Sequence, residues 1–210
     1  VPIFVIENSI DFDLFAPVRK HRKKETVTIG WAGTATHEID YQHAFSALVR
    51  VLHRHKNLFV EFWGGHIPSP IARGLERGIG QGQVGVRSWV PIHQYPAWLS
   101  AVNWDLSLAP LQFNEFNRAK SALKLIEAGA LKIPCLASNV CEYKRFCEAN
   151  PKLQTLLCSS SDEWEEKLER FVSNEELRVE LGEELHREVK ERHLIQHRIP
   201  LLRKIFAGEP

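Results

Sequence analysis

The chain has 210 residues, with 27 lysines and arginines against 26 aspartates and glutamates, and 44% of its residues are hydrophobic. This balance is typical of a globular domain with a large core, and it excludes disordered, collagen-like and disulfide-scaffold proteins. No stretch approaches the ~20 apolar residues that cross a bilayer, and the first residues lack the features of a signal peptide. We therefore expect a cytoplasmic protein. The sequence contains no methionine, so we also expect that a segment precedes Val1 in the whole protein.

The charged residues are distributed unevenly along the chain. Residues 162–210 carry an excess of acidic side chains, and residues 1–161 carry an excess of basic ones. A basic front part suits a small anionic ligand, but the excess is too weak to predict nucleic-acid binding. The basic run 19–24 has no apolar period, which favours a solvated linker over a phosphate or partner site. The cysteines are spaced too widely for a paired metal site, so we expect no metal and reduced thiols at Cys135, Cys141, Cys147 and Cys158.

Apolar runs and helical patterns alternate over most of the chain. In chain order the sequence predicts strand 27–34 ending in a Gly/Thr turn, helix 41–55, strand 58–63, a connection 67–82 with room for a short helix, strand 84–90, helix 92–102, strand 105–111, polar loop 112–118, helix 121–130, strand 133–138, helix 142–149 and strand 153–158. Apolar, non-alternating strands separated by helices indicate a doubly wound α/β fold, in which helices cover both faces of a parallel, Rossmann-like sheet.

The last quarter of the chain has only helical patterns. A first helix from Ser161 carries an apolar stripe, a second follows Asn174, and a third covers about 199–206. We therefore expect three parts: a linker over 1–25, a Rossmann-like domain over 26–160, and C-terminal helices over 161–210. These helices would pack on the domain or on a missing N-terminal domain.

Ligands of doubly wound sheets bind at the carboxyl ends of the strands, where helix N-termini present free amides to anions. The turn at Gly33 and Thr34 is one candidate, because glycine permits close backbone approach and the hydroxyl can donate to phosphate; His37 lies beside it. The turn has neither the G-x-G-x-x-G pattern of dinucleotide sites nor the Gly-Lys-Ser/Thr of a P-loop.

The second candidate is the start of the helix 121–130. Ser121 is a plausible N-cap, so the amides of Ala122, Leu123 and Lys124 would point outward beside Lys120. Glu127 lies on a half-buried apolar face and leans toward the same anion, which suits sugar hydroxyls as donors. Capping by local backbone, or pairing with Lys124 at the surface, is an equal alternative for Glu127.

The chain resembles the donor-nucleotide half of the retaining glycosyltransferases of GT-B fold, group 1 type, in the segment 120–138, which has the pattern K-S-x-x-K-x-x-E-A-x-A-x-x-x-P-x-x-A-S. Segments 5–17, 29–36, 89–91 and 105–110 are similar to that family's interdomain linker, first strand and glycine loop, base-binding loop and following strand. The variant F-N-x-x-K-S at 116–121 is similar to a divergent branch related to spore-coat and surface-polysaccharide glycosyltransferases.

The resemblance implies a role for each matching residue. Glu127 would hold the ribose hydroxyls as the second glutamate of the E-x7-E motif. The diphosphate would be held by the amides of Ala122 and Leu123, by Lys120 and by the Gly33-Thr34 turn, and the backbone at Trp89 and Val90 would meet the base. Ala119 stands where the first glutamate belongs, so the sugar contact is missing or made by Asn117 or Glu115. Lys132 and Ile133 stand where the family has a glycine before its proline.

We therefore interpret the chain as the sugar-nucleotide-binding domain of a glycosyltransferase that moves a sugar from a nucleoside-diphosphate donor to a glycan, lipid or other acceptor. The resemblance implies no metal or other cofactor, and it places the acceptor-side catalytic residues in a missing N-terminal domain. The fragment alone would then be inactive. The alternative, favoured by Ala119, is a non-catalytic nucleotide-binding or assembly domain of the same fold. A hydrolase is disfavoured because the chain has no G-x-S-x-G elbow.

Overall fold

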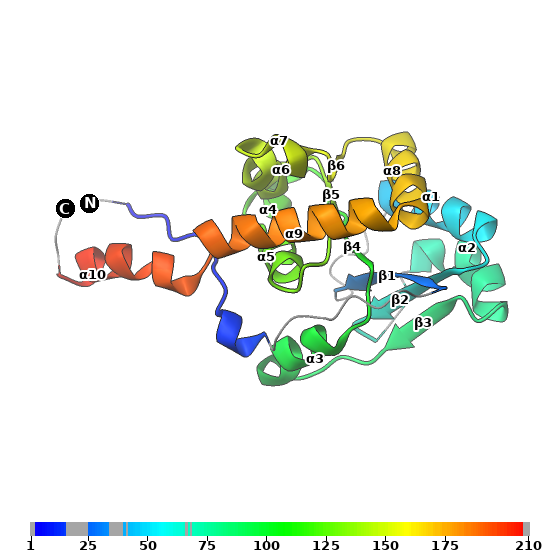
Figure 1. Cartoon of the computed structure of the whole chain (residues 1–210), viewed down its shortest axis with the longest axis horizontal. Coiled ribbons are helices and arrows are strands. Elements are labelled where there is room, and N and C mark those ends of the chain that lie inside the picture. Colours follow the sequence, from blue (N-terminus) through cyan, green and yellow to red (C-terminus); the bar gives the residue numbers. More distant parts are fainter. Residues whose placement is uncertain are drawn as a thin grey trace.

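The computed structural model describes residues 3–15, 25–33, 40, 42–65, 67 and 69–207. At its centre lies one six-stranded sheet with the order β3-β2-β1-β4-β5-β6, in which every pairing is parallel (Figure 1). The strands are β1 (Val27–Ala32), β2 (Leu58–Trp63), β3 (Val84–Arg87), β4 (Leu106–Ala109), β5 (Cys135–Ser138) and β6 (Leu157–Cys158). The doubly wound fold is confirmed. The basic run 19–24, Thr34 and His37 lie outside the described residues.

Helices connect the strands and cover both faces of the sheet. They are α1 (Gln42–Arg54), α2 (Ser69–Gly80), α3 (Tyr95–Ala101), α4 (Glu115–Arg118), α5 (Leu123–Ala130), α6 (Cys141–Glu148) and α7 (Pro151–Gln154). The strand order reverses between β1 and β4, since β1 pairs with β2 on one side and with β4 on the other. This is the switch point at which ligands of such sheets bind. The turn after β1 and the start of α5 both lie beside it.

The core explains why the central strands are apolar without alternation. Ile29 and Trp31 of β1 and Phe62 of β2 are fully buried. Trp31 contacts Phe45 of α1 edge-on, with ring centroids 6.3 Å apart. These three side chains share one face of the sheet. On the other face of β1 the ring of Trp104 lies against Gly30, so neither face of this strand is open to water.

Two predicted elements were wrong in type. Residues 153–158 form the end of α7 and the two-residue strand β6 instead of one strand. Asn150 starts α7 by accepting hydrogen bonds from the amides of Lys152 and Leu153, and Pro151 suits the first helical position. The loop over 112–118 contains α4, whose N-cap Asn114 accepts from the amide of Asn117. The connection before β3 does hold the helix for which the sequence left room, and this helix, α2, has 12 residues.

Lys132, which stands where the resemblance places glycine, has a backbone φ of 56°. This left-handed conformation is the one that glycine adopts without steric cost. The chain therefore keeps the turn after α5 with a lysine, whose carbonyl oxygen lies against Gly182. A Cβ atom on Gly182 would lie 2.3 Å from that oxygen.

Two helices of the C-terminal part lie on the sheet domain. They are α8 (Ser161–Ser173), which packs on α1, and α9 (Glu175–Arg192), which packs on α5. Ion pairs connect α1 to α8, with Arg50 2.5 Å from Glu165 and Arg54 2.6 Å from Glu169. The last helix, α10 (Ile199–Ala207), has no buried residue and extends away from the sheet (Figure 1).

The first described segment is joined to the junction of α9 and α10. Ile10 pairs in parallel with Leu194, and its amide donates to the carbonyl oxygen of His193 at 2.8 Å.

Among the helices of the described part, none is long and apolar enough to cross a membrane.

Candidate functional site

A cavity of about 210 Å³ opens at the carboxyl ends of the first three strands. Three predicted site residues line it: Gly33 after β1, and Trp89 and Val90 after β3. Trp63 at the end of β2 and Lys124 of α5 also line it. Tyr95 of α3 lines it as well, so the structure brings together the ends of three strands and two helices around a mostly apolar space, as expected for a flat ring bound at the carboxyl ends of the strands.

Two glycines make the wall of this cavity possible. The amide of Gly33 donates to the carbonyl oxygen of Trp63 at 2.9 Å, which brings the two loops into contact. Gly64 follows with φ of 130°, and a Cβ atom there would lie 1.8 Å from the carbonyl oxygen of Gly33. Any side chain at position 64 would therefore separate the loops and change the cavity.

Lys124, Glu127 and Tyr95 form a partly buried polar cluster next to the cavity. Tyr95 and Lys124 line the 210 Å³ cavity and also a second, smaller one, which Glu127 lines with them. The Tyr95 hydroxyl donates to Glu127 Oε2 at 3.2 Å. The Lys124 ammonium donates to the carbonyl oxygen of Ala32 and lies 5.9 Å from the centroid of the Trp31 ring. The cluster therefore connects α5 to the end of β1 across the switch point.

Burial dominates the ionisation of this cluster. It raises the pKa of Glu127, against the opposing effect of the Lys124 charge and the Tyr95 hydrogen bond. Burial also lowers the pKa of Lys124, although the charge of Glu127 opposes the shift. The pKa of Tyr95 is raised by burial and then by Glu127. A lysine and a glutamate held partly desolvated at a cavity gain from any ligand that supplies an anion to one and hydroxyl donors to the other.

The expected N-cap at Ser121 was wrong. Helix α5 begins at Leu123, its N-cap residue is Ala122, and no side chain caps it. The Ser121 hydroxyl instead accepts a hydrogen bond from the Asn8 side-chain nitrogen at 2.7 Å. The first helical hydrogen bonds are made to Ala122, one residue after Ser121, because the amides of Leu125 and Ile126 both donate to the carbonyl oxygen of Ala122. The start of α5 remains a place for an anion, since alanine cannot satisfy the first amides.

The remaining predicted residues are divided between surface and interior. Leu123 is exposed and Ala122 is buried. Asn117 is 1% exposed, and its side-chain nitrogen donates to Asp40 Oδ1 at 2.7 Å and to the carbonyl oxygen of Gln112 at 2.8 Å. The structure therefore places Asn117 in the interior, where its side chain holds the segment before α5.

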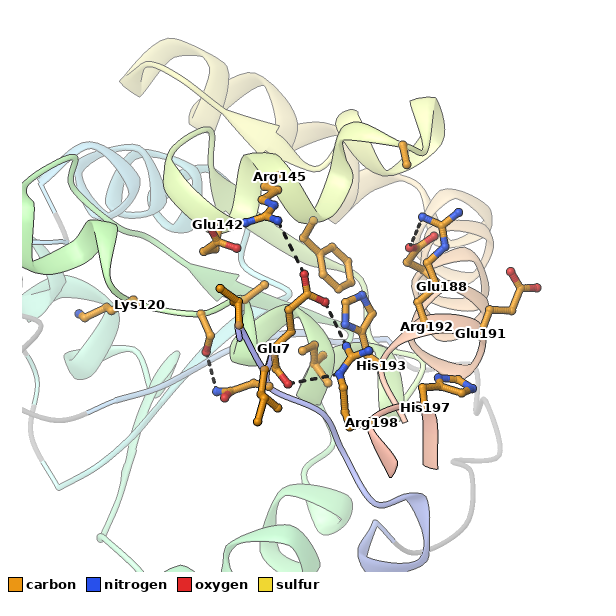
Figure 2. A pocket seen from close by; sticks show the side chains of 18 of the residues that line it. Glu7, Lys120, Glu142, Arg145, Glu188, Glu191, Arg192, His193, His197 and Arg198 are labelled. Atoms are coloured by element: carbon orange, nitrogen blue, oxygen red, sulfur yellow. Dashed lines mark hydrogen bonds and ion pairs between the residues drawn. The ribbon is translucent and has the colours of Figure 1, made fainter. Parts of the chain in front are cut away.

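Lys120, Ser121 and Ala122 line a larger cavity of about 660 Å³ between the start of α5, the first described segment and the end of α9. Figure 2 shows Glu7 at its centre, facing Arg145 of α6 and Arg198. Arg198 lies 3.1 Å from the Glu7 carboxylate, and Arg145 lies 4.0 Å from it. These pairs are partly exposed and join the first segment to the body of the protein.

His193 also lines this larger cavity and stacks on Phe146, with ring centroids 4.7 Å apart. Burial, followed by the charge of Arg198, lowers its pKa to about 4. The ring is therefore neutral at pH 7 and serves for packing. Among the residues that the structure describes, no group of three histidine, cysteine, aspartate or glutamate side chains is arranged to hold a metal.

The sequence did not assign Tyr95, Asp40 and Trp63 to the site. It indicated Lys124 only for its backbone amide and as an alternative partner of Glu127. Lys124 carried a readable signal, because it lies three residues before Glu127 and thus on the same helix face. Tyr95 precedes Glu127 by 32 residues. No local pattern connects positions so far apart, so that contact required the fold.

The sequence model of the glycosyl transferase-like family matches residues 42–204. No curated protein shows significant similarity to the sequence. The fold resembles that of the C-terminal domain of LpcC, a group 1 glycosyl transferase family protein from Francisella tularensis, with a TM-score of 0.63 and 18% identity over 89% of this chain and 100% of that one. It also resembles sucrose-phosphate synthase from Thermosynechococcus elongatus, with a TM-score of 0.69 and 18% identity over 96% of this chain and 52% of the synthase.

A third similar structure is a variant of TarM from S. aureus in complex with fondaparinux, α-GlcNAc-glycerol and UDP. Its TM-score is 0.66 at 18% identity, over 97% of this chain and 38% of TarM. The chain thus spans about half of the synthase and less than half of TarM, while it spans all of the LpcC domain. The fold is that of a C-terminal GT-B domain, and the chain belongs to the glycosyl transferase-like family.

Proposed function

We propose that this domain binds the nucleoside diphosphate of a sugar nucleotide, and that the whole protein transfers the sugar to an acceptor with retention of its anomeric configuration. The observation that carries the proposal is the position of Lys124 and Glu127. Both lie on α5 at the switch point, between an apolar cavity on one side and the uncapped start of the helix on the other.

Each part of the donor has a matching group. The base fits the 210 Å³ cavity beside Trp89 and Val90. The Glu127 carboxylate can accept hydrogen bonds from ribose hydroxyls, and Lys124, Lys120 and the first amides of α5 can hold the diphosphate. When the bond from the sugar carbon to the diphosphate oxygen breaks, negative charge develops on the diphosphate. Positive groups fixed at that place stabilise the charge.

We infer that these protein cations suffice for binding and that no metal is needed. The acceptor is expected to be contacted by a second domain, so that this domain alone binds the donor without transferring sugar. The residues of that second domain would then determine which acceptor is used.

Isothermal titration calorimetry with UDP, GDP, dTDP and ADP tests the proposal directly. We expect at least one diphosphate to bind, with equal affinity in EDTA and in magnesium. UDP is the first choice because the TarM structure contains it. If none of the four binds to the folded protein, the proposed function is wrong.

Replacing Trp89 with alanine should weaken a nucleoside and its diphosphate equally, by about three- to tenfold, because aromatic contact contributes about 1 kcal/mol to binding. Trp89 is 65% exposed and lines the cavity, so its removal should leave the core intact. Phe206→Ala is the matched control, since this aromatic residue of α10 is 85% exposed and lies outside the cavity. A loss confined to the diphosphate would contradict the placement of the base.

A non-catalytic nucleotide-binding domain is the second candidate. Ala119 favours it, because a methyl group stands where the resemblance places the carboxylate that contacts the sugar. The whole protein, incubated with a sugar nucleotide and an acceptor panel, distinguishes the two functions. Release of nucleoside diphosphate above the uncatalysed rate would support the enzyme, and tight binding without release would support the second candidate.

A further inference from the structure

A buried carboxylate lies behind the start of α5. Asp40, which precedes α1, is 4% exposed. An ionised side chain so far from water is costly unless hydrogen bonds compensate it. Its Oδ1 atom accepts from the amide of Gln112 at 3.0 Å and from the side-chain nitrogen of Asn117 at 2.7 Å. Its Oδ2 atom lies 3.5 Å from the ammonium nitrogen of Lys120.

These three partners belong to one segment, residues 112–120, which connects β4 to the start of α5. Asn117 also donates to the carbonyl oxygen of Gln112, so the segment is folded back on itself around the carboxylate. Asp40 comes from a different part of the chain, 77 residues before Asn117. The course of the segment before α5 therefore depends on one side chain of another loop.

Lys120 is held but not enclosed. Its side chain is 23% exposed, and its ammonium group lies between Asp40 and the Phe116 ring, 5.1 Å from the ring centroid. The same lysine lines the larger cavity together with Ser121 and Ala122. An ammonium group has three donors, so it can contact a carboxylate behind it and an anion in front of it at the same time.

We propose that Asp40 is a positioning residue for the diphosphate: it fixes Lys120 and the segment 112–120 so that the ammonium group lies beside the first amides of α5. This inference rests on the proposed function. Asp40 does not touch the ligand, and it acts through Lys120. A neutral residue at position 40 would leave the Lys120 ammonium group free to rotate into water.

Asp40→Asn tests the proposal, because asparagine keeps the shape and one acceptor but removes the charge that holds Lys120. We expect UDP, or whichever diphosphate the wild type binds, to bind about tenfold more weakly. The corresponding nucleoside should bind as it does to the wild type. A purely structural role would not separate the two ligands, since a damaged fold weakens both.

A double-mutant cycle identifies the residue through which Asp40 acts. Lys120→Met should give a similar loss of diphosphate affinity, and the double variant should lose little more than either single variant, since both changes remove one coupled contact. Asp105→Asn is the matched control. Asp105 Oδ2 accepts a hydrogen bond from the amide of Thr28 at 2.8 Å. This contact lies at the amino ends of β1 and β4, away from the carboxyl ends at which the cavity opens. This variant should lose stability without losing affinity.

Three results would overturn the inference: unchanged diphosphate affinity in Asp40→Asn, an equal loss for nucleoside and diphosphate, or additive losses in the double variant. If Asp40→Asn does not fold, the wild type provides the test. The Lys120 side-chain resonance should shift on titration with UDP and stay fixed on titration with uridine, and an unshifted resonance in both would also overturn it. A wild type that binds no diphosphate rejects the proposed function instead.

Discussion

Replacing Lys124 with methionine is expected to reduce the affinity for a nucleoside diphosphate about 10- to 100-fold while leaving the nucleoside affinity unchanged. A hydrogen bond to a charged group contributes about 1.5–3 kcal/mol, which corresponds to this range. The ammonium group of Lys124 is held at the end of β1 by the carbonyl oxygen of Ala32. It is therefore oriented before the ligand arrives, and little of its binding energy is lost in ordering a flexible side chain.

Calorimetry with the diphosphate and the nucleoside measures this effect, and thermal unfolding shows whether the variant is folded. Lys167→Met is the matched control, since Lys167 of α8 also donates to a backbone carbonyl at the end of a strand, that of Leu157 in β6. The control should lose the same kind of bond without losing affinity. Equal weakening in both variants would show that Lys124 stabilises the fold and does not bind the ligand.

The second large effect is expected for Glu127→Gln. The diphosphate and the nucleoside should both bind about tenfold more weakly, because ribose is common to them and a neutral amide accepts weaker hydrogen bonds than a carboxylate. In contrast to Lys124→Met, this variant should not separate the two ligands. Glu184→Gln is the control, since Glu184 of α9 is a buried glutamate that accepts a hydrogen bond from the Asn150 side chain and lines neither cavity beside Glu127.

The same substitution should change how stability depends on pH. Burial raises the pKa of Glu127 above its usual value of 4.5 in the folded protein. The folded state therefore keeps a proton that the unfolded chain has released, so this residue contributes most stability below pH 4.5 and loses it as the pH rises through the raised pKa. Glutamine mimics the protonated form. We expect the variant, without ligand, to melt at a higher temperature than the wild type at pH 7 and at a similar temperature at pH 4.

Thermal unfolding between pH 4 and pH 8 measures this difference. A variant that melts lower than the wild type at pH 7 would show that the attraction of the Lys124 charge and the Tyr95 hydrogen bond together outweigh the cost of burial. Improved stability combined with weaker binding is the result expected of a residue kept for its ligand.

The sequence was sufficient for the parts of the fold that follow from local pattern. The sheet, its parallel direction and the helix that carries Glu127 could be predicted, because apolar strands buried on both faces and a strongly periodic helix are local signals. Strand β6 and helix α7 were not separated, because Leu153, Leu156 and Leu157 lie within five residues of one another and were assigned to a single strand. Asn150 and Pro151 were the only indication that the run begins as a helix.

The site was predictable only where its residues are neighbours in the chain. The positions of Lys124 and Glu127 follow from helix geometry, Lys120 lies just before that helix in the chain, and the resemblance added the loop at Trp89. The contacts of Tyr95 with Glu127 and of Asp40 with Asn117 could not be predicted, since each joins residues that are far apart in the chain and that only the fold brings together. The N-cap at Ser121 was wrong because serine is favoured at that position by propensity, whereas its hydroxyl is used by Asn8.

The contacts between the first segment and the α9–α10 junction are expected to form late in folding. Glu7 and Arg198 are 191 residues apart in the chain. Closing a loop of that length in an unfolded chain costs about 4–5 kcal/mol of conformational entropy. A partly exposed ion pair offsets little of this cost, and the burial of Ile10 and the stacking of Phe12 on His186 offset a further part. These contacts can therefore form only after the sheet has brought the two ends together. We therefore expect them to be late contacts in folding and early ones to open when the native protein fluctuates.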